Sequence, residues 1–162
     1  MNKRALVTGG AGFIGSNLVD KLIDEGYEVA VIDNESSSVN TQFYWNDKAQ
    51  NHLTNITDQR ECSKIFANFK PDYVFHLAAH SRIPIAIKNP IQCCDVNVVG
   101  TCNMLQQSRE HGVKRFMFSS TSSVYGLKNK CPLREDMPRD CLNPYSVSKA
   151  AAEDLCKMYY NL

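Results

Sequence analysis

The sequence lacks a long apolar run, an excess of one charge, and any signal-peptide pattern at its N-terminus. A membrane-spanning helix needs about 18 or more consecutive apolar residues, and no such run is present. The 18 lysines and arginines nearly balance the 17 aspartates and glutamates, so the net charge is +1. That balance gives no bulk attraction for nucleic acid or an anionic membrane. We therefore expect a soluble, cytoplasmic protein with neither as a partner.

The cysteines and histidines also lack the spacing of metal ligands. The seven cysteines include no C-x-x-C pair, and the adjacent Cys93 and Cys94 do not have a ligand spacing. The four histidines, at 52, 76, 80 and 111, form no H-E-x-x-H pattern. An odd, scattered cysteine count is typical of reduced thiols rather than disulfides. The sequence thus predicts free thiols and no metal site.

What the sequence does contain is a glycine-rich turn near its N-terminus. An apolar, β-prone run over 5–7 leads into Gly9, Gly10, Gly12 and Gly15, and an amphipathic stretch follows. The residues fit both G-x-G-x-x-G and, starting at Thr8, T-G-x-x-G-x-x-G. Such a turn lets the backbone approach a pyrophosphate and points a helix N-terminus at the phosphates. A glycine-rich run alone is also typical of an ordinary turn, so the neighbouring sequence must decide between an ordinary turn and a dinucleotide site.

Asp33 supplies that context, because it ends the next apolar strand at the position of a ribose-binding acid. A carboxylate there can accept hydrogen bonds from both ribose hydroxyls and would repel a 2′-phosphate. Asn34 and Glu35 follow, without a nearby arginine or lysine. The pattern predicts a dinucleotide site that prefers NAD to NADP. The alternative is a solvated acidic strand end.

The apolar periodicity predicts strands that alternate with helices along the whole chain. We expect strands over 5–7, 28–33, 52–56, 73–78 and 114–119; helices over 13–25, 59–69, 91–111 and from residue 144 or 145 onward; a loop with a short helix over 34–52; and loops over 80–90 and 126–144. This order predicts one α/β domain, a doubly wound parallel sheet (Rossmann fold), over residues 1–162. Ligands bind such sheets at the carboxyl ends of the strands.

A second motif, Y-x-x-x-K, is formed by Tyr145 and Lys149 at the start of the last helix. Residues four apart share one helix face, and an ammonium group near a phenol favours the phenolate form. The tyrosine could then act as a general base near neutral pH. Alone, this spacing occurs by chance in many helices. Here it lies 24 residues after Thr121, in a chain that opens with the glycine-rich turn.

Taken together, these motifs resemble the extended branch of the short-chain dehydrogenase/reductase superfamily, with nucleotide-sugar epimerases of the UDP-glucose 4-epimerase type most alike. The segments that carry the resemblance, in family order, are Thr8–Gly15, Asp33–Asn34, Phe75–Ala79, Asn97–Thr101, Ser119–Gly126 and Asn143–Lys149. The resemblance covers essentially the whole chain. Family members are longer, with a second half that supplies the last strands and the substrate domain. It therefore implies a cofactor-binding part without that half, either an N-terminal fragment of a larger enzyme or a natural short form.

The resemblance implies a role for each matching residue. For the cofactor NAD it implies the pyrophosphate turn Gly9, Gly12, Phe13, Ile14 and Gly15; Asp33 and Asn34 at the adenosine ribose; Asn55 and Ile56 at the adenine, with Asn55 where the family usually has Asp; and Leu77, Ala78, Ala79, Asn97 and Ser119 along the cofactor. Asn97 is alternatively a polar helix-start residue. For catalysis it implies Thr121 and Tyr145, and Lys149 as partner of the tyrosine and ribose anchor. Candidate substrate contacts are Ser81, Arg82, Ser122 and Ser123.

The implied reaction is epimerisation at C4 of a nucleotide sugar, with a UDP-sugar expected, through a transient 4-keto sugar. Dehydratases of this branch carry an acid pair where this chain has Ser122 and Ser123, which argues against dehydration. The alternatives are a non-catalytic NAD-binding module or a related dehydratase or reductase. The resemblance also implies a homodimer through the helices over 91–111 and 145–162, and a truncated sheet with exposed apolar surface favours self-association.

Overall fold

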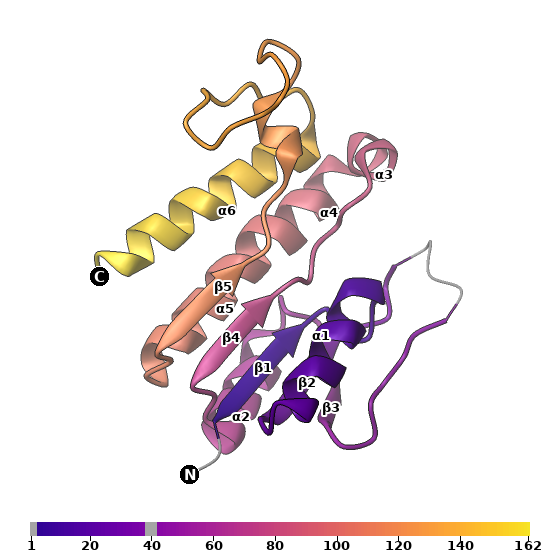
Figure 1. Ribbon diagram of the computed structural model, residues 1–162, viewed down its shortest axis with the longest axis vertical. Coiled ribbons are helices and arrows are strands. Elements are labelled where there is room, and N and C mark those ends of the chain that lie inside the picture. The colour runs from indigo at the N-terminus through magenta and orange to yellow at the C-terminus, as the bar shows by residue number, and fades with distance from the viewer. Residues whose placement is uncertain (1–2, 38–41) are drawn as a thin grey trace.

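The computed structural model describes residues 3–37 and 42–162, and these form an α/β fold around one parallel sheet (Figure 1). Its strands are β1 (Arg4–Thr8), β2 (Glu28–Asp33), β3 (Gln50–Leu53), β4 (Tyr73–His76) and β5 (Arg115–Phe118). They lie in the order β3-β2-β1-β4-β5, and every neighbouring pair is parallel. The chain winds outward from β1 to β3 and then returns to β4 on the other side. The expected doubly wound sheet is confirmed.

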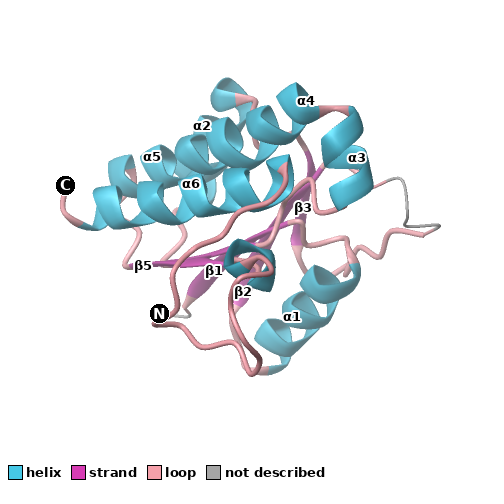
Figure 2. Cartoon of the chain, turned by 90° about the horizontal axis from the view of Figure 1, so that it is seen from above, coloured by secondary structure: helices cyan, strands magenta, loops and turns pink. Residues whose placement is uncertain are grey.

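Alternating side chains of β1 build two cores, one on each face of the sheet. Val7 packs in a cluster with Val19 of α1 (Phe13–Asp24), whereas Leu6 packs in a cluster with Phe66 and Met104. Figure 2 shows α1 on one face of the sheet and the other long helices on the opposite face. A strand buried on both faces is apolar throughout, which is why β1 was recognisable in the sequence.

The helices of the opposite face include α2 (Gln59–Phe69) and a long rod made of three segments. The rod comprises α4 (Pro90–Cys94), a π-helical stretch η1 (Asp95–Gly100) and α5 (Thr101–Glu110). The long α6 (Pro144–Tyr160) lies beside this rod. Asn143 caps α6, since its side chain accepts a hydrogen bond from the Ser146 N–H at 2.9 Å. A short 3₁₀ helix, η2 (Ser122–Tyr125), follows β5.

Two local predictions were wrong, and a third falls partly on residues that the structure does not describe. Residues 80–90 contain a short helix, α3 (Ile83–Lys88), because a proline is tolerated in the first turn of a helix. The third strand is Gln50–Leu53 rather than 52–56; it is a mostly exposed edge strand, so no apolar pattern marks it. Within 34–52 the described residues form no helix, and residues 38–41 lie outside the described part.

Some further features concern the whole described part of the chain. No helix within residues 3–37 and 42–162 is long and apolar enough to cross a membrane. The same residues contain no group of three or more histidine, cysteine or acidic side chains placed to hold a metal ion. All seven cysteines are free.

Candidate functional site

A cavity of about 570 Å³ lies at the carboxyl ends of the strands. Its wall includes residues that directly follow four strands: Gly9, Asn34, Leu77 and Ser119. The residues predicted at the cofactor that line it are Gly9, Gly12, Phe13, Ile14, Gly15, Asp33, Asn34, Asn55, Ile56, Leu77, Ala78, Ala79, Ser119, Tyr145 and Lys149, and the candidate substrate contacts Ser81 and Arg82 also line it. Segments far apart in sequence therefore share one cavity.

The glycine-rich turn forms a cradle that side chains would fill. Gly9 has a φ of +70°, and a Cβ added there would lie 2.8 Å from the backbone nitrogen of Ala78. A Cβ on Gly15 would overlap the carbonyl oxygen of Gly9. The helix α1 begins just after Gly12 without a side-chain cap, so the first N–H groups of the helix face the cavity unblocked. Free N–H groups and the helix dipole suit an anionic group such as a pyrophosphate.

Asp33 is held at the cavity rim by two backbone N–H groups. Its Oδ2 accepts from Ala11 at 3.1 Å and its Oδ1 from Glu35 at 2.8 Å. Glu35 has a left-handed φ of 54°, and its carboxylate accepts a hydrogen bond from the Trp45 indole N–H at 2.7 Å. Each carboxylate oxygen of Asp33 keeps a lone pair for a further donor. The side chain is thus oriented before any ligand arrives.

The opposite wall is formed by the first turns of α6. Tyr145 and Lys149 line the cavity there together with Ser119. The Lys149 Nζ donates a hydrogen bond to the Ser119 carbonyl oxygen at 2.6 Å and lies 4.1 Å from the ring centre of Phe118. Burial lowers the pKa of Lys149 to about 8. The ammonium form is therefore present at neutral pH and is lost just above it.

Sequence reasoning missed several residues of the wall. Phe43, Thr54 and Ser120 line the cavity as well. Phe43 and Thr54 lie in polar, irregular segments, where no periodicity marks a residue as inward-facing. Ser120 directly follows Ser119 at the end of β5, and that position in the sequence is a usable signal for a residue of the cavity wall.

A buried hydrogen-bonded network under the cavity was also missed. The Nδ1 atom of His76 lies 2.6 Å from the Thr8 hydroxyl, and its Nε2 lies 3.0 Å from the Thr101 hydroxyl. Thr101 donates its own proton to the Asn97 carbonyl oxygen at 2.6 Å, so we assign the ring proton to Nε2 and let Nδ1 accept from Thr8. Full burial lowers the pKa of His76 to about 3, so the ring is neutral. The network ties β1 and β4 to the long rod of helices.

Asn97 belongs to this network and does not line the cavity. Its Oδ1 accepts the His80 N–H at 2.7 Å, and its Nδ2 donates to the Ser148 hydroxyl at 2.9 Å. Asn97 thereby joins the segment after β4 to α6. In this structure its side chain has protein partners, and a cofactor contact for Asn97 stays a prediction.

Thr121 does not line the cavity that Tyr145 and Lys149 line. It lines a second hollow of about 510 Å³ together with Ser122, and neither residue lines the first cavity. Its Oγ1 accepts the N–H of Ser123 at 3.1 Å, which caps η2. Ser123 lines neither hollow, whereas Ser120 lines both. The roles predicted for Thr121, Ser122 and Ser123 stay predictions.

The comparison with known proteins agrees with this geometry. A family model described as GDP-mannose 4,6 dehydratase matches residues 6–162. The chain belongs to this family. Within it, a relative from Methanocaldococcus jannaschii named "Putative UDP-glucose 4-epimerase" is 39% identical over 159 residues, which cover 97% of this chain and 51% of the relative.

Solved structures of related proteins match over the same extent. The UDP-glucose 4-epimerase of Thermotoga maritima, crystallised with UDP-glucose, has a TM-score of 0.92 at 38% identity, covering 98% of this chain and 51% of that one. The UDP-glucose 4-epimerase of Thermus thermophilus, in complex with NAD, has a TM-score of 0.90 at 33% identity, with 98% and 51% covered. The chain thus spans about half the length of the relatives it matches.

Proposed function

We propose that this chain binds NAD⁺ and forms the cofactor-binding part of an enzyme that inverts C4 of a UDP-sugar. One observation carries the proposal: a single cavity has the glycine-rich turn and Asp33 on one side and Tyr145 with Lys149 on the other. Binding of a dinucleotide needs the glycine-rich turn and the carboxylate of Asp33. Proton transfer beside the reactive end of the dinucleotide needs a base such as Tyr145. The names of the relatives and the NAD complex of the Thermus enzyme support it.

The residues present fit the cofactor. The cradle at Gly9 and Gly15 leaves room for backbone N–H groups to contact a pyrophosphate. Asp33 offers its remaining lone pairs to ribose hydroxyls, and no arginine or lysine stands beside it in the sequence to hold a 2′-phosphate. NAD⁺, when bound, supplies a reversible hydride acceptor. Preference for NAD⁺ over NADP⁺ follows from the carboxylate.

The chemistry assigned to the protein is proton transfer at the sugar C4 hydroxyl. Tyr145 takes the hydroxyl proton as the 4-keto sugar forms, and it returns a proton when the keto group is reduced on its other face. Lys149 brings a positive charge to the same wall of the cavity. Thr121 retains its own hydroxyl proton while it accepts the Ser123 N–H, so it can still donate to an oxyanion.

Turnover tests this proposal directly. The chain is incubated with NAD⁺ and UDP-glucose, UDP-N-acetylglucosamine or UDP-glucuronate, and proton NMR follows the products. We expect the C4 epimer of one of these sugars, and Tyr145→Phe should lower its rate by about 100-fold or more, as for the loss of a general base. Calorimetry with NAD⁺ alone accompanies the assay. An epimerisation rate that Tyr145→Phe leaves unchanged contradicts the role of the tyrosine.

A second candidate is a non-catalytic NAD-binding module. It is favoured by the absence of Thr121 from the cavity that Tyr145 and Lys149 line. NAD⁺ binding without turnover of any of the three sugars is expected of this candidate and equally of a cofactor-binding part tested without the rest of its enzyme, whereas turnover would contradict this candidate. Absence of NAD⁺ binding would contradict both. The family model is described as a 4,6 dehydratase, but dehydration is disfavoured here. Elimination of water uses a pair of acidic side chains, and this chain has Ser122 and Ser123 in their place.

A further inference from the structure

Two side chains on successive turns of α6 hold two successive residues after β5. Lys149 donates to the carbonyl oxygen of Ser119 at 2.6 Å. Glu153, one turn later on the same helix, accepts a hydrogen bond from the Ser120 hydroxyl through its Oε1. The helix thus grips the backbone of one residue and the side chain of the next. The following residue is Thr121.

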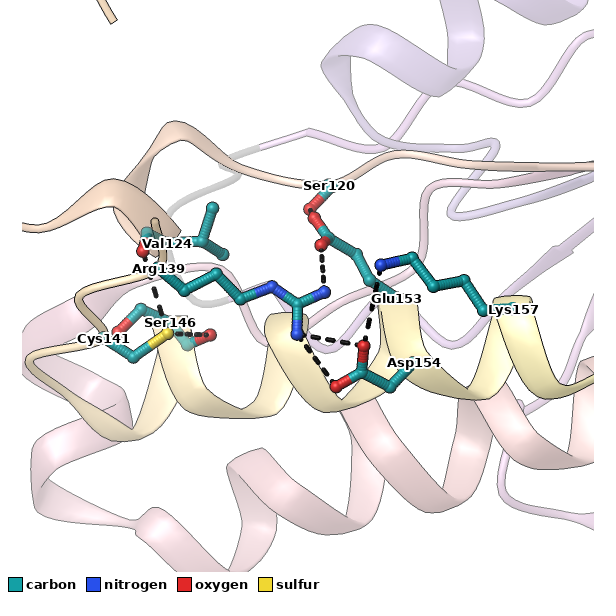
Figure 3. A network of polar contacts seen from close by, with 8 residues as sticks. All are labelled: Ser120, Val124, Arg139, Cys141, Ser146, Glu153, Asp154 and Lys157. Carbon is teal, nitrogen blue, oxygen red and sulfur yellow. Dashed lines mark hydrogen bonds and ion pairs between the residues drawn. The ribbon is translucent and has the colours of Figure 1, made fainter. Parts of the chain in front are cut away.

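The second carboxylate oxygen of Glu153 points the other way, toward Arg139 (Figure 3). Arg139 lies in the long segment between η2 and α6, and its guanidinium donates to Glu153 Oε2 at 2.7 Å. It also donates to both oxygens of Asp154, at 2.9 and 2.8 Å. Arg139 and Glu153 are both partly buried, which makes the pair less screened than a fully exposed one. Glu153 is therefore fixed from one side while it holds Ser120 from the other.

Ser120 is the residue through which this contact reaches the functional site. It lines the first cavity beside Tyr145 and Lys149, and it also lines the second hollow beside Thr121. Glu153 itself lines only the second of these two hollows. Ser119 and Thr121 are the chain neighbours of Ser120. A shift of Ser120 would therefore move the Ser119 carbonyl away from Lys149, and it would also displace Thr121.

We propose that Glu153 is a positioning residue that, through the Ser120 hydroxyl, holds the segment Ser119–Thr121 in register with Tyr145 and Lys149 of the NAD⁺ site. The proposal rests on the proposed function, because the site that it positions is the proposed cofactor site. The same helix that carries the tyrosine and the lysine thereby also sets the distance to the strand end that faces them.

The competing explanation is that Glu153 merely stabilises the surface through its ion pair with Arg139. Ion pairs at a protein surface contribute about 1 kcal/mol or less to folding, and neither Arg139 nor Glu153 lines the first cavity. Asp154 provides the matched control, since it shares Arg139 with Glu153 but makes no contact with Ser120. Four single variants of the full chain separate the two explanations: Ser120→Ala, Glu153→Ala, Glu153→Gln and Asp154→Asn.

The measurement is the Kd for NAD⁺ by isothermal titration calorimetry, with a thermal melting curve for each variant. We expect Glu153→Ala and Ser120→Ala each to raise Kd about three- to tenfold, the range for one lost hydrogen bond. Glu153→Gln keeps an oxygen that accepts from Ser120, so its Kd should stay within about twofold of the wild type. Asp154→Asn should leave Kd unchanged even where it lowers the melting temperature as much as Glu153→Gln does.

A double variant tests whether Glu153 and Ser120 act through the same contact. If Glu153 acts through Ser120, Glu153→Ala should have no further effect on Kd in a Ser120→Ala background. Additive effects, or a Glu153→Gln variant as weak as Glu153→Ala, would overturn the positioning role. A wild-type chain that binds NAD⁺ with the same Kd as Glu153→Ala would overturn it as well. A wild-type chain that binds no NAD⁺ would instead contradict the proposed function on which it rests.

Discussion

At the scale of single residues, Lys149 carries an ammonium group on a residue that is 3% exposed. The ammonium group contacts the Ser119 carbonyl and the Phe118 ring, but these contacts do not fully replace its lost hydration. Burial therefore lowers the pKa of Lys149 from 10.5 to about 8. A shift of this size corresponds to about 3 kcal/mol of instability at neutral pH, at about 1.4 kcal/mol per pKa unit. A charge retained at such a cost points to a function for it.

Lys149→Met should therefore make the chain more stable at pH 7, by about 1–3 kcal/mol, while weakening NAD⁺ binding. The pH dependence has a definite sign. Between pH 8 and 10.5 the unfolded chain binds the Lys149 proton and the folded chain does not, so wild-type stability rises across this window relative to the variant. Urea unfolding at several pH values measures both effects. A Lys149→Met chain that is less stable than the wild type at pH 7 would contradict the argument.

At the scale of elements, a comparison of two glycines distinguishes the effect of backbone strain from the effect of a steric clash. Gly26, at the end of α1, has a φ of +81° and nothing within 4 Å of an added Cβ. Gly15, inside α1, would place its Cβ against the backbone of Gly9 and Gly10. Gly26 has room for a side chain, but its left-handed φ disfavours one. Gly15 has no room, because the backbone of the glycine-rich turn occupies the place of a Cβ.

We expect Gly26→Ala to cost roughly 1–2 kcal/mol of stability, the cost of a left-handed alanine, and to leave the Kd for NAD⁺ unchanged. Gly15→Ala should displace the turn and raise that Kd at least about tenfold, since charge-assisted hydrogen bonds to the pyrophosphate would be lost. Thermal melting and calorimetry on the pair provide the comparison. Equal loss of NAD⁺ affinity in both variants would show that general instability, rather than the cradle, controls binding.

The elements also show why part of the structure could be predicted from the sequence. β1 and the turn after it were recognisable because their signals are local: an apolar run, then glycines at fixed offsets. The polar β3 and the short α3 had no such signal. The contacts of His76 with Thr8 and Thr101, and of Glu153 with Ser120, join residues 25 to 68 positions apart. No spacing rule reaches that far, so the supporting network of the site could be seen only after folding.

At the scale of the whole molecule, the helices cover the sheet unevenly. α1 packs against β1 and β2 on one face, while α2 and α5 cover the opposite face. In β5, Phe116 packs toward the α2 and α5 side, so the next residue, Met117, points to the face that carries α1. Among the described strands, β5 pairs only with β4, which leaves its outer edge open. Two surfaces are thus available for self-association: this edge region, and the exposed side of the η1 and α6 helices.

We propose that the chain forms a homodimer through the helices, as the resemblance implies, and matched variants decide between the two surfaces. Val99 of η1 and Met158 of α6 are 55% and 44% exposed, so Val99→Glu with Met158→Glu should shift the equilibrium to monomer without unfolding the chain. Met117→Lys should leave the dimer intact. Sedimentation velocity over a range of concentrations measures all three proteins. A dimer lost only in Met117→Lys would assign self-association to the open side of β5, and a wild type that stays monomeric would exclude both.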